Sequence, residues 1–384
     1  MIKKILIANR GEIAVRIVRA CAEMGIRSVA VYSDADRHAL HVKRADESYS
    51  LGQDPLAGYL NPQRLVSLAV ETGCDALHPG YGFLSENAHF SELCEQHGIK
   101  FIGPSAEVIR RMGDKTEARR SMIAAGVPCT PGTEGNLADL AEAIREAARI
   151  GYPVMLKATS GGGGRGIRRC NSQEELEQAY PRVISEATKA FGSAEVFLEK
   201  CIVNPKHIEA QILADSFGNT VHLFERDCSI QRRNQKLIEI APSPQLTPEQ
   251  RAYIGELSVR AAKAVGYENA GTVEFLLADD EVYFMEMNTR VQVEHTITEE
   301  ITGIDIVREQ IRIASGLPLS IKQEDIQYHG FALQFRINAE DPKNNFFPSF
   351  GKITRYYAPG GPGVRTDTAI YTGYVIPPHY DSMC

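Results

Sequence analysis

The feature that most constrains the fold is a predicted β-hairpin formed by residues 271–278 (GTVEFLLA) and 282–288, with a three-residue turn between its strands. From residue 286 to 294, polar side chains alternate with mostly apolar ones, which is typical of an extended segment with one polar and one buried face. The three-residue turn places Glu274 directly opposite Glu286. Two facing carboxylates repel each other unless a cation lies between them, so the hairpin predicts a functional site.

The polar face of this segment offers hard oxygen ligands first, and then a guanidinium, an amide and a second carboxylate. Its members are Glu286, Asn288, Arg290, Gln292 and Glu294. Carboxylate and amide oxygens suit Mg²⁺ or Mn²⁺. An extended chain over these residues spans roughly 26 Å, so we expect a curl after Asn288 if all of them serve one site. A solvated hairpin face is the alternative, and the dense apolar residues around both glutamates argue against it.

Length and composition indicate a globular enzyme with several domains. The 384 residues are enough for two or three domains, and 43% hydrophobic and 24% charged residues are ordinary values. The net charge of −7 argues against a nucleic-acid platform, and no apolar run is long enough to cross a membrane. The eight cysteines contain no C-x-x-C pair and no signal peptide precedes them, so we expect reduced thiols in a cytoplasmic protein.

Residues 1–113 are predicted to form a Rossmann-like domain with a parallel sheet, because an apolar strand, a helical stretch and a second strand open the chain. The turn after the first strand has a single glycine, so NAD binding through G-x-G-x-x-G is not expected there. The loop HPGYGFLSEN, with Tyr81 and Gly82, follows a later strand. That edge of an open α/β sheet is where ligands bind, although a tight structural turn is an equal alternative.

Residues 114–203 are predicted to form a second domain with a glycine-rich lid. A strand at 152–158 is followed by GGGGRG at 161–166. Such a loop brings backbone N–H groups against phosphate oxygens and can close over a nucleotide, and Lys157 can place a charge on the same phosphates. A flexible linker is the alternative, but linkers rarely lie inside a strand–loop–strand unit.

Residues 204–384 are predicted to contain the catalytic and C-terminal domain. A local basic cluster, Arg226, Arg232, Arg233 and Lys236, suggests anionic substrates, with a solvated charge run as the alternative. Residues 330–341 (GFALQFRINAED) alternate like a strand that carries Arg336 on its polar face.

Taken together, these motifs resemble the biotin carboxylases, a family of ATP-grasp enzymes, across essentially the whole chain. The motifs that occur in the family's order are IANRGEIA, HPGYGFLSEN, MGDK, GGGGRG, RDCSIQRR, EMNTRVQVEH and RINAED. The resemblance implies an α/β and α+β multidomain fold with a Rossmann-like parallel sheet, an ATP-grasp lid and a C-terminal antiparallel-sheet domain. It also implies that ATP phosphorylates bicarbonate to carboxyphosphate, whose carboxyl group then passes to N1 of biotin.

The resemblance assigns roles to individual residues. The implied ATP contacts are Lys115, Lys157, Gly163, Gly164, Gly166, Glu199, Lys200, Ile202, His207, Gln231 and Asn234. The implied Mg²⁺ or Mn²⁺ ligands are Glu274, Glu286 and Asn288, and the implied bicarbonate contacts are Lys236, Arg290, Gln292 and Val293. The implied catalytic residues are Glu294 as the base, Arg336 at the biotin enolate, Arg290 and Lys236, and the implied biotin contacts are Tyr81, Gly82 and Arg336.

The resemblance also implies partners. No Met-Lys-Met biotin-acceptor motif is present, so we expect biotin on a separate carboxyl carrier protein or domain, a carboxyltransferase subunit, and a homodimer. The segment QRRNQKLIEIAPS is closer to subunits of pyruvate carboxylases than to those of acetyl-CoA carboxylases. The chain departs from the family at Asn234, usually histidine, at Thr296, usually proline, and at Pro362, often an aromatic residue of the dimer interface. The family continues for several dozen residues past Cys384, so we expect an incomplete last domain.

Two other functions remain open from the residues. Another ATP-grasp carboxylate–amine ligase would use the same metal and phosphate groups but would not require Arg336 or biotin. A non-catalytic nucleotide-binding regulatory subunit is the second. Lys236, Arg290 and Glu294 argue against it, because sensing ATP requires no bicarbonate base.

Overall fold

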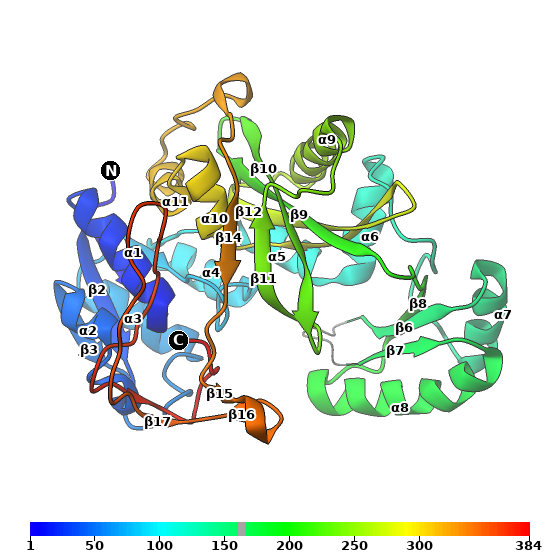
Figure 1. Ribbon diagram of the computed structural model, residues 1–384, viewed down its shortest axis with the longest axis horizontal. Coiled ribbons are helices and arrows are strands. Elements are labelled where there is room, and N and C mark those ends of the chain that lie inside the picture. The colour runs from blue at the N-terminus through cyan, green and yellow to red at the C-terminus, as the bar shows by residue number, and fades with distance from the viewer. Residues whose placement is uncertain (160–165) are drawn as a thin grey trace.

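The computed structural model describes residues 1–159 and 166–384, so the expected nucleotide contacts Gly163 and Gly164 lie outside the described residues. The chain forms an N-terminal unit around a parallel sheet, a small unit with an antiparallel sheet, and a large unit around a six-stranded antiparallel sheet (Figure 1). This combination confirms the predicted mixed α/β and α+β architecture.

The N-terminal sheet is parallel and has the strand order β3-β2-β1-β4-β5. Its strands are β1 (Lys4–Ile7), β2 (Arg27–Tyr32), β3 (Glu47–Ser50), β4 (Ala76–His78) and β5 (Lys100–Phe101). The helices around it are α1 (Gly11–Glu23), η1 (Asp34–Asp36), α2 (Leu40–Arg44), α3 (Pro62–Glu71), α4 (Ala88–Gln96) and α5 (Ala106–Gly113). Ile5 and Ile7 pack in one apolar cluster with α1, and Leu6 packs in another with α3 and α4. Because both faces of β1 are covered, its sequence is a continuous apolar run.

The carboxyl ends of β1 and β4 meet where the strand order reverses. The side-chain amide of Asn9 donates hydrogen bonds to the carbonyls of Pro79 and Tyr81, at 2.7 Å each. Gly80 between them has φ +62°, and a Cβ atom there would lie 2.9 Å from Asn9 Nδ2. The tight loop therefore brings Tyr81 to the edge at which open α/β sheets bind ligands.

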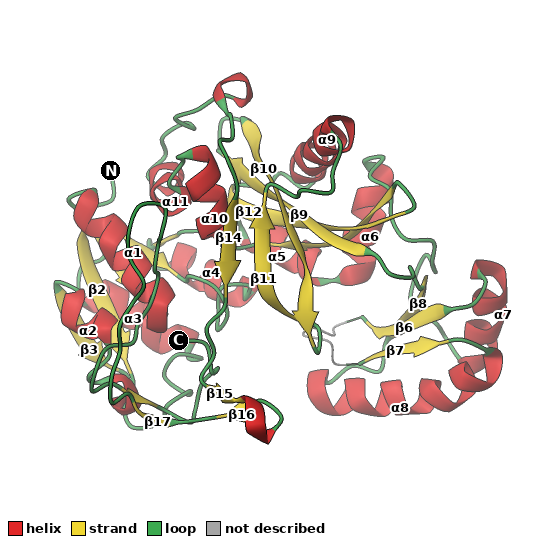
Figure 2. Cartoon of the chain, in the orientation of Figure 1, coloured by secondary structure: helices red, strands yellow, loops and turns green. Residues whose placement is uncertain are grey.

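The small unit lies at the opposite end of the molecule from the N-terminal sheet (Figure 1). Its strands are β6 (Val154–Ala158), β7 (Ile167–Cys170) and β8 (Val196–Lys200), in the order β7-β6-β8. Helices α7 (Leu140–Ile150) and α8 (Gln173–Phe191) pack against this sheet through the apolar side chains of one cluster (Figure 2). The glycine run of the sequence falls between β6 and β7.

The large unit is built on an antiparallel sheet with the order β13-β12-β9-β10-β11-β14. The strands are β9 (Lys206–Ala214), β10 (Thr220–Arg232), β11 (Gln235–Ala241), β12 (Asn269–Ala278), β13 (Glu281–Asn288) and β14 (Ala332–Phe335). The helices are α6 (Lys115–Ala124), α9 (Pro248–Ala264), α10 (His295–Thr302), α11 (Ile306–Ala314) and η2 (Gln323–Asp325). Apolar residues of α6 and α9 pack with the inner residues of β9, β12 and β13 in one core.

The hairpin of β12 and β13 contains the predicted glutamate pair, but the predicted turn is wrong. Ala278 pairs with Glu281, so the turn has two residues, Asp279 and Asp280, with φ +49° and +65°. Positive φ at both positions is typical of the tight hairpin turns that match strand twist. A β-bulge next to Glu274 then shifts the register by one residue and sets Glu274 opposite Glu286.

The last part of the chain returns to the N-terminal unit, where the red segment runs beside the blue helices (Figure 1). Its short elements are β15 (Glu340–Asp341), η3 (Pro342–Asn344), β16 (Phe347–Pro348), β17 (Gly351–Lys352) and β18 (Val375–Ile376). The hydroxyl of Tyr380 lies 2.7 Å from Ser33 Oγ and donates to the carbonyl of Pro55 at 2.9 Å. Among the described residues, every helix is too short or too polar to cross a membrane.

Candidate active site

One large cleft, of about 1500 Å³, lies between the three units. It is lined by the β1 and β4 loops, by α6, by the small sheet and by the polar face of the large sheet. Of the predicted site residues that the structure describes, Gly166 alone is not part of the lining. The strand β13 ends at Asn288 and α10 begins at His295, so the chain curls between them and all five polar residues of this segment reach the cleft.

The Lys236 ammonium is the centre of the charged groups in the cleft. It donates to Glu209 at 2.5 Å, to Glu274 at 2.9 Å and to Glu294 at 2.7 Å. Burial lowers the pKa of Lys236, but the three carboxylates outweigh burial and hold that pKa well above its usual value. A buried ammonium with three anionic partners remains charged, and each of its three N–H donors has a carboxylate acceptor.

Glu294, which directly precedes α10, is held by two cations. Its second oxygen accepts from Arg336 Nη2 at 3.0 Å, and Arg336 Nε donates to Glu239 at 2.6 Å. Burial raises the pKa of Glu294, but Lys236 and Arg336 outweigh burial, so the group is a carboxylate with a pKa below its usual value. The sequence resemblance assigned a base and an enolate-stabilising arginine to this pair, and the structure brings them into contact.

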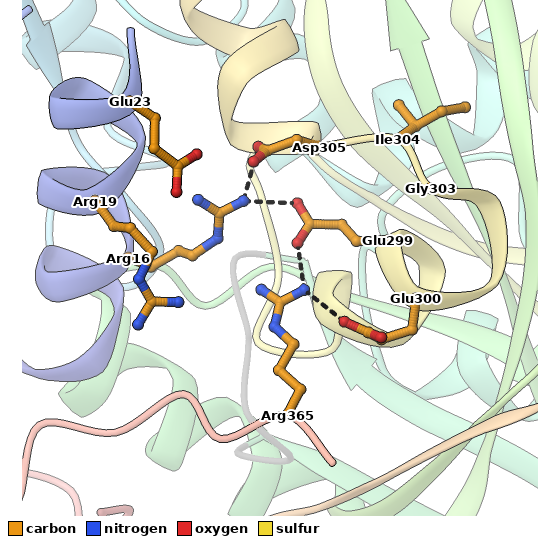
Figure 3. Close-up of a pocket in the computed structure, with 9 residues that line it drawn as sticks. All are labelled: Arg16, Arg19, Glu23, Glu299, Glu300, Gly303, Ile304, Asp305 and Arg365. Atoms are coloured by element: carbon orange, nitrogen blue, oxygen red, sulfur yellow. Dashed lines mark hydrogen bonds and ion pairs between the residues drawn. The ribbon is translucent and has the colours of Figure 1, made fainter. Parts of the chain in front are cut away.

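A second, smaller hollow shows how α10 is joined to the elements around it (Figure 3). Glu299 on α10 accepts from Arg16 of α1 at 3.0 Å and from Arg365 at 2.8 Å. Arg16 also donates to Asp305 at 2.7 Å. The buried Arg16–Glu299 pair joins α10 to α1 of the N-terminal unit, and it thereby helps to position Glu294, which caps the start of α10.

The facing carboxylates of Glu274 and Glu286 have different surroundings. Glu274 accepts from His207 Nε2 at 2.7 Å, from Asn288 Nδ2 at 2.9 Å and from Gln292 Nε2 at 2.9 Å, besides Lys236. Burial and the neighbouring Glu274 raise the pKa of Glu286, which Lys115 opposes. A divalent cation would supply the positive charge that Glu286 lacks, so this pair of hard oxygen ligands fits Mg²⁺ or Mn²⁺.

Asn288 is the third expected metal ligand, and its amide is already engaged. Its nitrogen donates to Glu274, and its oxygen accepts from Arg290 Nη2 at 3.0 Å. Another group of ligand atoms, from His207, Glu209 and Glu274, lies within 4.8 Å of one another. Lys236 already donates to both of those glutamates, so that group has its cation.

The expected nucleotide contacts lie on the side of the cleft nearest the small unit. Lys157 forms a short ion pair with Glu199, and His207 Nδ1 lies 2.9 Å from the amide nitrogen of Gln231. Asp114 caps α6 and so sets Lys115 at the first position of that helix. Lys200 lines the cleft, but its ammonium donates to the backbone carbonyls of residues 151 and 152 at 2.9 Å.

The structure shows where the three residues that depart from the family pattern lie. Asn234 occupies the second position of the two-residue β10–β11 turn with φ +62°, a conformation that asparagine tolerates well. Thr296 Oγ1 donates a short hydrogen bond to Gln334 and so joins α10 to β14. Pro362 is exposed.

The four basic residues expected to attract anions do not lie together on one surface. The prediction is therefore wrong for three of them. Arg226 has no exposed surface, Arg232 pairs with Glu340, and Arg233 donates to Asn345. Lys236 is the single member that lines the cleft. Charge spacing along β10 and β11 does not show which side of the sheet each residue faces.

Three residues of the site, Glu209, Glu86 and Arg119, are not among those predicted from the sequence. Glu209 holds Lys236, and its spacing of two from His207 on β9 was the signal for a shared face. Glu86 accepts from Arg290 Nε at 2.8 Å and from the Thr289 backbone at 3.2 Å. Arg119 lines the cleft 3.7 Å from Glu199. Neither Glu86 nor Arg119 carries a local pattern that separates it from a surface residue.

Three family models match the chain in succession. Residues 1–109 match the N-terminal domain of biotin carboxylase, residues 114–322 the ATP-binding domain of the carbamoyl-phosphate synthase L chain, and residues 334–384 the C-terminal domain of biotin carboxylase.

Curated relatives align with nearly the whole chain. It is 59% identical to the 2-oxoglutarate carboxylase small subunit of Hydrogenobacter thermophilus, over 100% of this chain and 81% of the relative. It is 57% identical to biotin carboxylase 1 of Bacillus subtilis, over 100% and 86%. It is 54% identical to a pyruvate carboxylase subunit of Methanothermobacter thermautotrophicus, over 100% and 78%.

A solved structure agrees with this fold closely. The biotin carboxylase domain dimer of the Hydrogenobacter thermophilus 2-oxoglutarate carboxylase, which contains MgADP, ADP and bicarbonate, superposes with a TM-score of 0.97. The two chains are 58% identical over 100% of this chain and 85% of the other. The matching family models, the relatives and this fold show that the chain belongs to the biotin carboxylases, ATP-dependent ligases of the ATP-grasp type.

Proposed function

We propose that this biotin carboxylase uses ATP, Mg²⁺ and bicarbonate to carboxylate biotin that is attached to a separate carrier protein. The observation that carries the proposal is the contact of Lys236 and Arg336 with one buried carboxylate, Glu294, in the cleft that also holds the facing Glu274 and Glu286. An ATPase without a carboxylation step has no need of a base held between two cations beside its metal ligands.

Lys115, Lys157 and His207 are assigned to the nucleotide. Phosphoryl transfer depends mainly on positioning and on the neutralisation of charge, and these cationic or polar groups face one side of the cleft. Mg²⁺ on Glu274 and Glu286 would offset the negative charge of the phosphate oxygens. The Lys157–Glu199 ion pair holds the lysine in place until phosphate oxygens compete for it.

Lys236, Arg290 and the amide of Gln292, with the backbone of Val293, are assigned to bicarbonate. Glu294 is assigned as the general base. Its carboxylate takes the hydroxyl proton of bicarbonate while a bicarbonate oxygen bonds to the γ-phosphorus of ATP and the bond to the ADP oxygen breaks. The products of this step are carboxyphosphate and ADP.

Arg336, Tyr81 and Gly82 are assigned to biotin. The carboxyl group of carboxyphosphate passes to N1 of biotin, and phosphate leaves with the proton that N1 loses. Arg336 is anchored through Nε to Glu239, which has no exposed surface, so its direction in the cleft is fixed. A fixed guanidinium stabilises the negative charge that forms on the ureido oxygen when N1 loses its proton.

The biotin-stimulated release of ADP tests this function. With Mg²⁺ and ATP, release should require bicarbonate and rise with free biotin, and labelled bicarbonate should enter biotin. Bicarbonate-dependent release that free biotin leaves unchanged, without labelled biotin, would point instead to another ATP-grasp substrate.

For the final acceptor we propose pyruvate, through a carboxyltransferase subunit. The segment QRRNQKLIEIAPS supports this choice, as does the similarity to relatives named for 2-oxo acid carboxylases. Carrier and carboxyltransferase subunits of pyruvate, 2-oxoglutarate and acetyl-CoA carboxylases can be mixed with this chain in turn. The pair that transfers labelled carboxyl groups fastest identifies the acceptor, and preference for the acetyl-CoA pair would refute the proposal.

We also propose that two copies of the chain form a homodimer. The related biotin carboxylase domain that crystallised as a dimer supports this state. Light scattering on the purified chain measures its mass in solution, and a mass of one chain at micromolar concentration would contradict the proposal.

A further inference from the structure

We propose that Arg226 is a positioning residue for the bicarbonate site: its guanidinium fixes the direction of the Gln292 amide and holds Glu209 beside Lys236. This inference rests on the proposed function, because it takes Gln292 and Lys236 as bicarbonate contacts. Arg226 itself does not line the cleft and acts through these neighbours.

Every N–H group of Arg226 has a partner. Nε donates to Glu209 at 2.6 Å. Nη1 donates to Gln211 and to Thr298, at 2.9 Å each. Nη2 donates to Thr272 at 3.2 Å and to the amide oxygen of Gln292 at 3.0 Å. A guanidinium has five N–H donors, so its position is completely determined by these bonds.

The bond to Gln292 decides which way its amide points. The amide oxygen accepts from Arg226, so the NH₂ group is directed toward Glu274, to which it donates at 2.9 Å. A reversed amide would set its NH₂ group against the guanidinium and its oxygen against the carboxylate. Both contacts would be repulsive, so Arg226 keeps the NH₂ group on the side of the cleft where an anion can bind.

The Glu209 carboxylate bridges two cations, Arg226 and Lys236. One oxygen of Glu209 accepts from Arg226 at 2.6 Å and the other from Lys236 at 2.5 Å. Glu209 has no exposed surface, so without Arg226 both oxygens would be left to Lys236. Lys236 would then be drawn toward Glu209 and away from the cleft.

A purely structural role is the alternative, because Arg226 joins β9, β10, β12 and α10. Arg251 provides a matched control. Its Nε donates at 2.8 Å to Glu225, the neighbour of Arg226 on β10, and Glu225 is also buried. Arg251 does not line the cleft. Arg251→Lys therefore changes a half-buried arginine on α9 that pairs with the neighbouring glutamate of β10, and it leaves the bicarbonate contacts untouched.

The test compares Arg226→Lys with Arg251→Lys in the full chain. Both should lower the melting temperature. Arg226→Lys should also raise the KM for bicarbonate about tenfold, the effect of one lost charge-assisted hydrogen bond, and leave the KM for ATP within about twofold. Arg251→Lys should leave both KM values unchanged.

A double-mutant cycle separates positioning from general destabilisation. In a Gln292→Ala background, Arg226→Lys should raise the bicarbonate KM by less than about threefold, because the amide that Arg226 orients is already absent. Should Arg226→Lys fail to fold, Thr272→Val is the substitute. It removes the other acceptor of Nη2 and should raise the bicarbonate KM about threefold, again non-additively with Gln292→Ala.

The outcomes are distinct. An equal effect of Arg226→Lys with and without Gln292, or a lower melting temperature with an unchanged bicarbonate KM, overturns the inference. A wild-type chain without bicarbonate-dependent ADP release refutes the proposed function itself, and the inference with it.

Discussion

Glu12, in the first turn of α1, predicts a dependence of stability on pH. Its carboxylate forms part of the cleft wall and accepts a short hydrogen bond from the Tyr81 hydroxyl. Burial raises the pKa of Glu12 from 4.5 to about 7. Tyr81, Arg16 and Arg365 oppose this rise, and Asp367 adds to it.

The sign follows from the direction of the shift. A carboxyl group whose folded pKa exceeds its unfolded value keeps its proton longer in the folded protein. Its contribution to stability is therefore complete below about pH 4.5 and is lost as the pH rises through about 7. The difference between these two pKa values corresponds to about 3 kcal/mol. Glu12 is only half-buried, and solvent in the cleft screens its charge. We therefore expect the change in the free energy of unfolding to be about 2 kcal/mol.

Glu12→Gln isolates the effect, since the amide oxygen can still accept from Tyr81 but cannot ionise. Equilibrium urea unfolding, followed by circular dichroism between pH 5 and 8, measures the stability of the wild type and the variant. Between pH 5 and 8, the free energy of unfolding of the variant should rise by about 2 kcal/mol relative to that of the wild type. Glu23→Gln, which changes an exposed carboxylate at the other end of α1, should give no such gain. Parallel curves for the wild type and Glu12→Gln would refute the reasoning.

Three further predictions concern the assigned roles. Glu294→Gln should lower kcat at least ~100-fold while the KM for ATP stays within about threefold, and unchanged turnover would remove this residue from the mechanism. Glu286→Gln should raise the Mg²⁺ concentration for half-maximal activity about tenfold or more, and an unaltered Mg²⁺ titration would contradict the metal assignment. Arg336→Ala should lower the carboxylation of biotin ~100-fold and bicarbonate-dependent ATP cleavage much less. Equal losses in the two assays would speak against a role at the biotin enolate.

The pairing of Glu274 with Glu286 shows how far pattern reasoning reaches. The prediction assumed a three-residue turn, and the structure has a two-residue turn and a one-residue bulge. Both routes insert one extra residue, so both bring the two glutamates opposite each other. The period of two along a strand is visible in a sequence, but the place where a bulge interrupts a ladder is decided by packing on neighbouring strands.

Arg226 shows where such reasoning ends. Its five hydrogen-bond partners lie between 15 and 72 residues away in the chain. From the sequence, the run of basic residues on β10 and β11 suggests anionic substrates or a solvated charge run, and neither reading expects a fully buried arginine, because exposure is the usual state of this residue. Burial became possible because β9 places Glu209 and Gln211 beside it and the curl after Asn288 returns Gln292 to the same place.

If the substrates bind as proposed, the two cations that contact Glu294 make its basicity depend on the substrates. A carboxylate whose pKa is held low by Lys236 and Arg336 is a weak base toward bicarbonate. In the proposed assignment, the negative charge of bicarbonate would compete for Lys236, and the ureido oxygen of biotin would compete for Arg336. Each substrate that takes over one of these hydrogen bonds raises the pKa of Glu294, because it removes an opposite charge from a buried carboxylate. Proton removal from bicarbonate should therefore be fastest when biotin also occupies the cleft, which is a reason for biotin to stimulate the release of ADP.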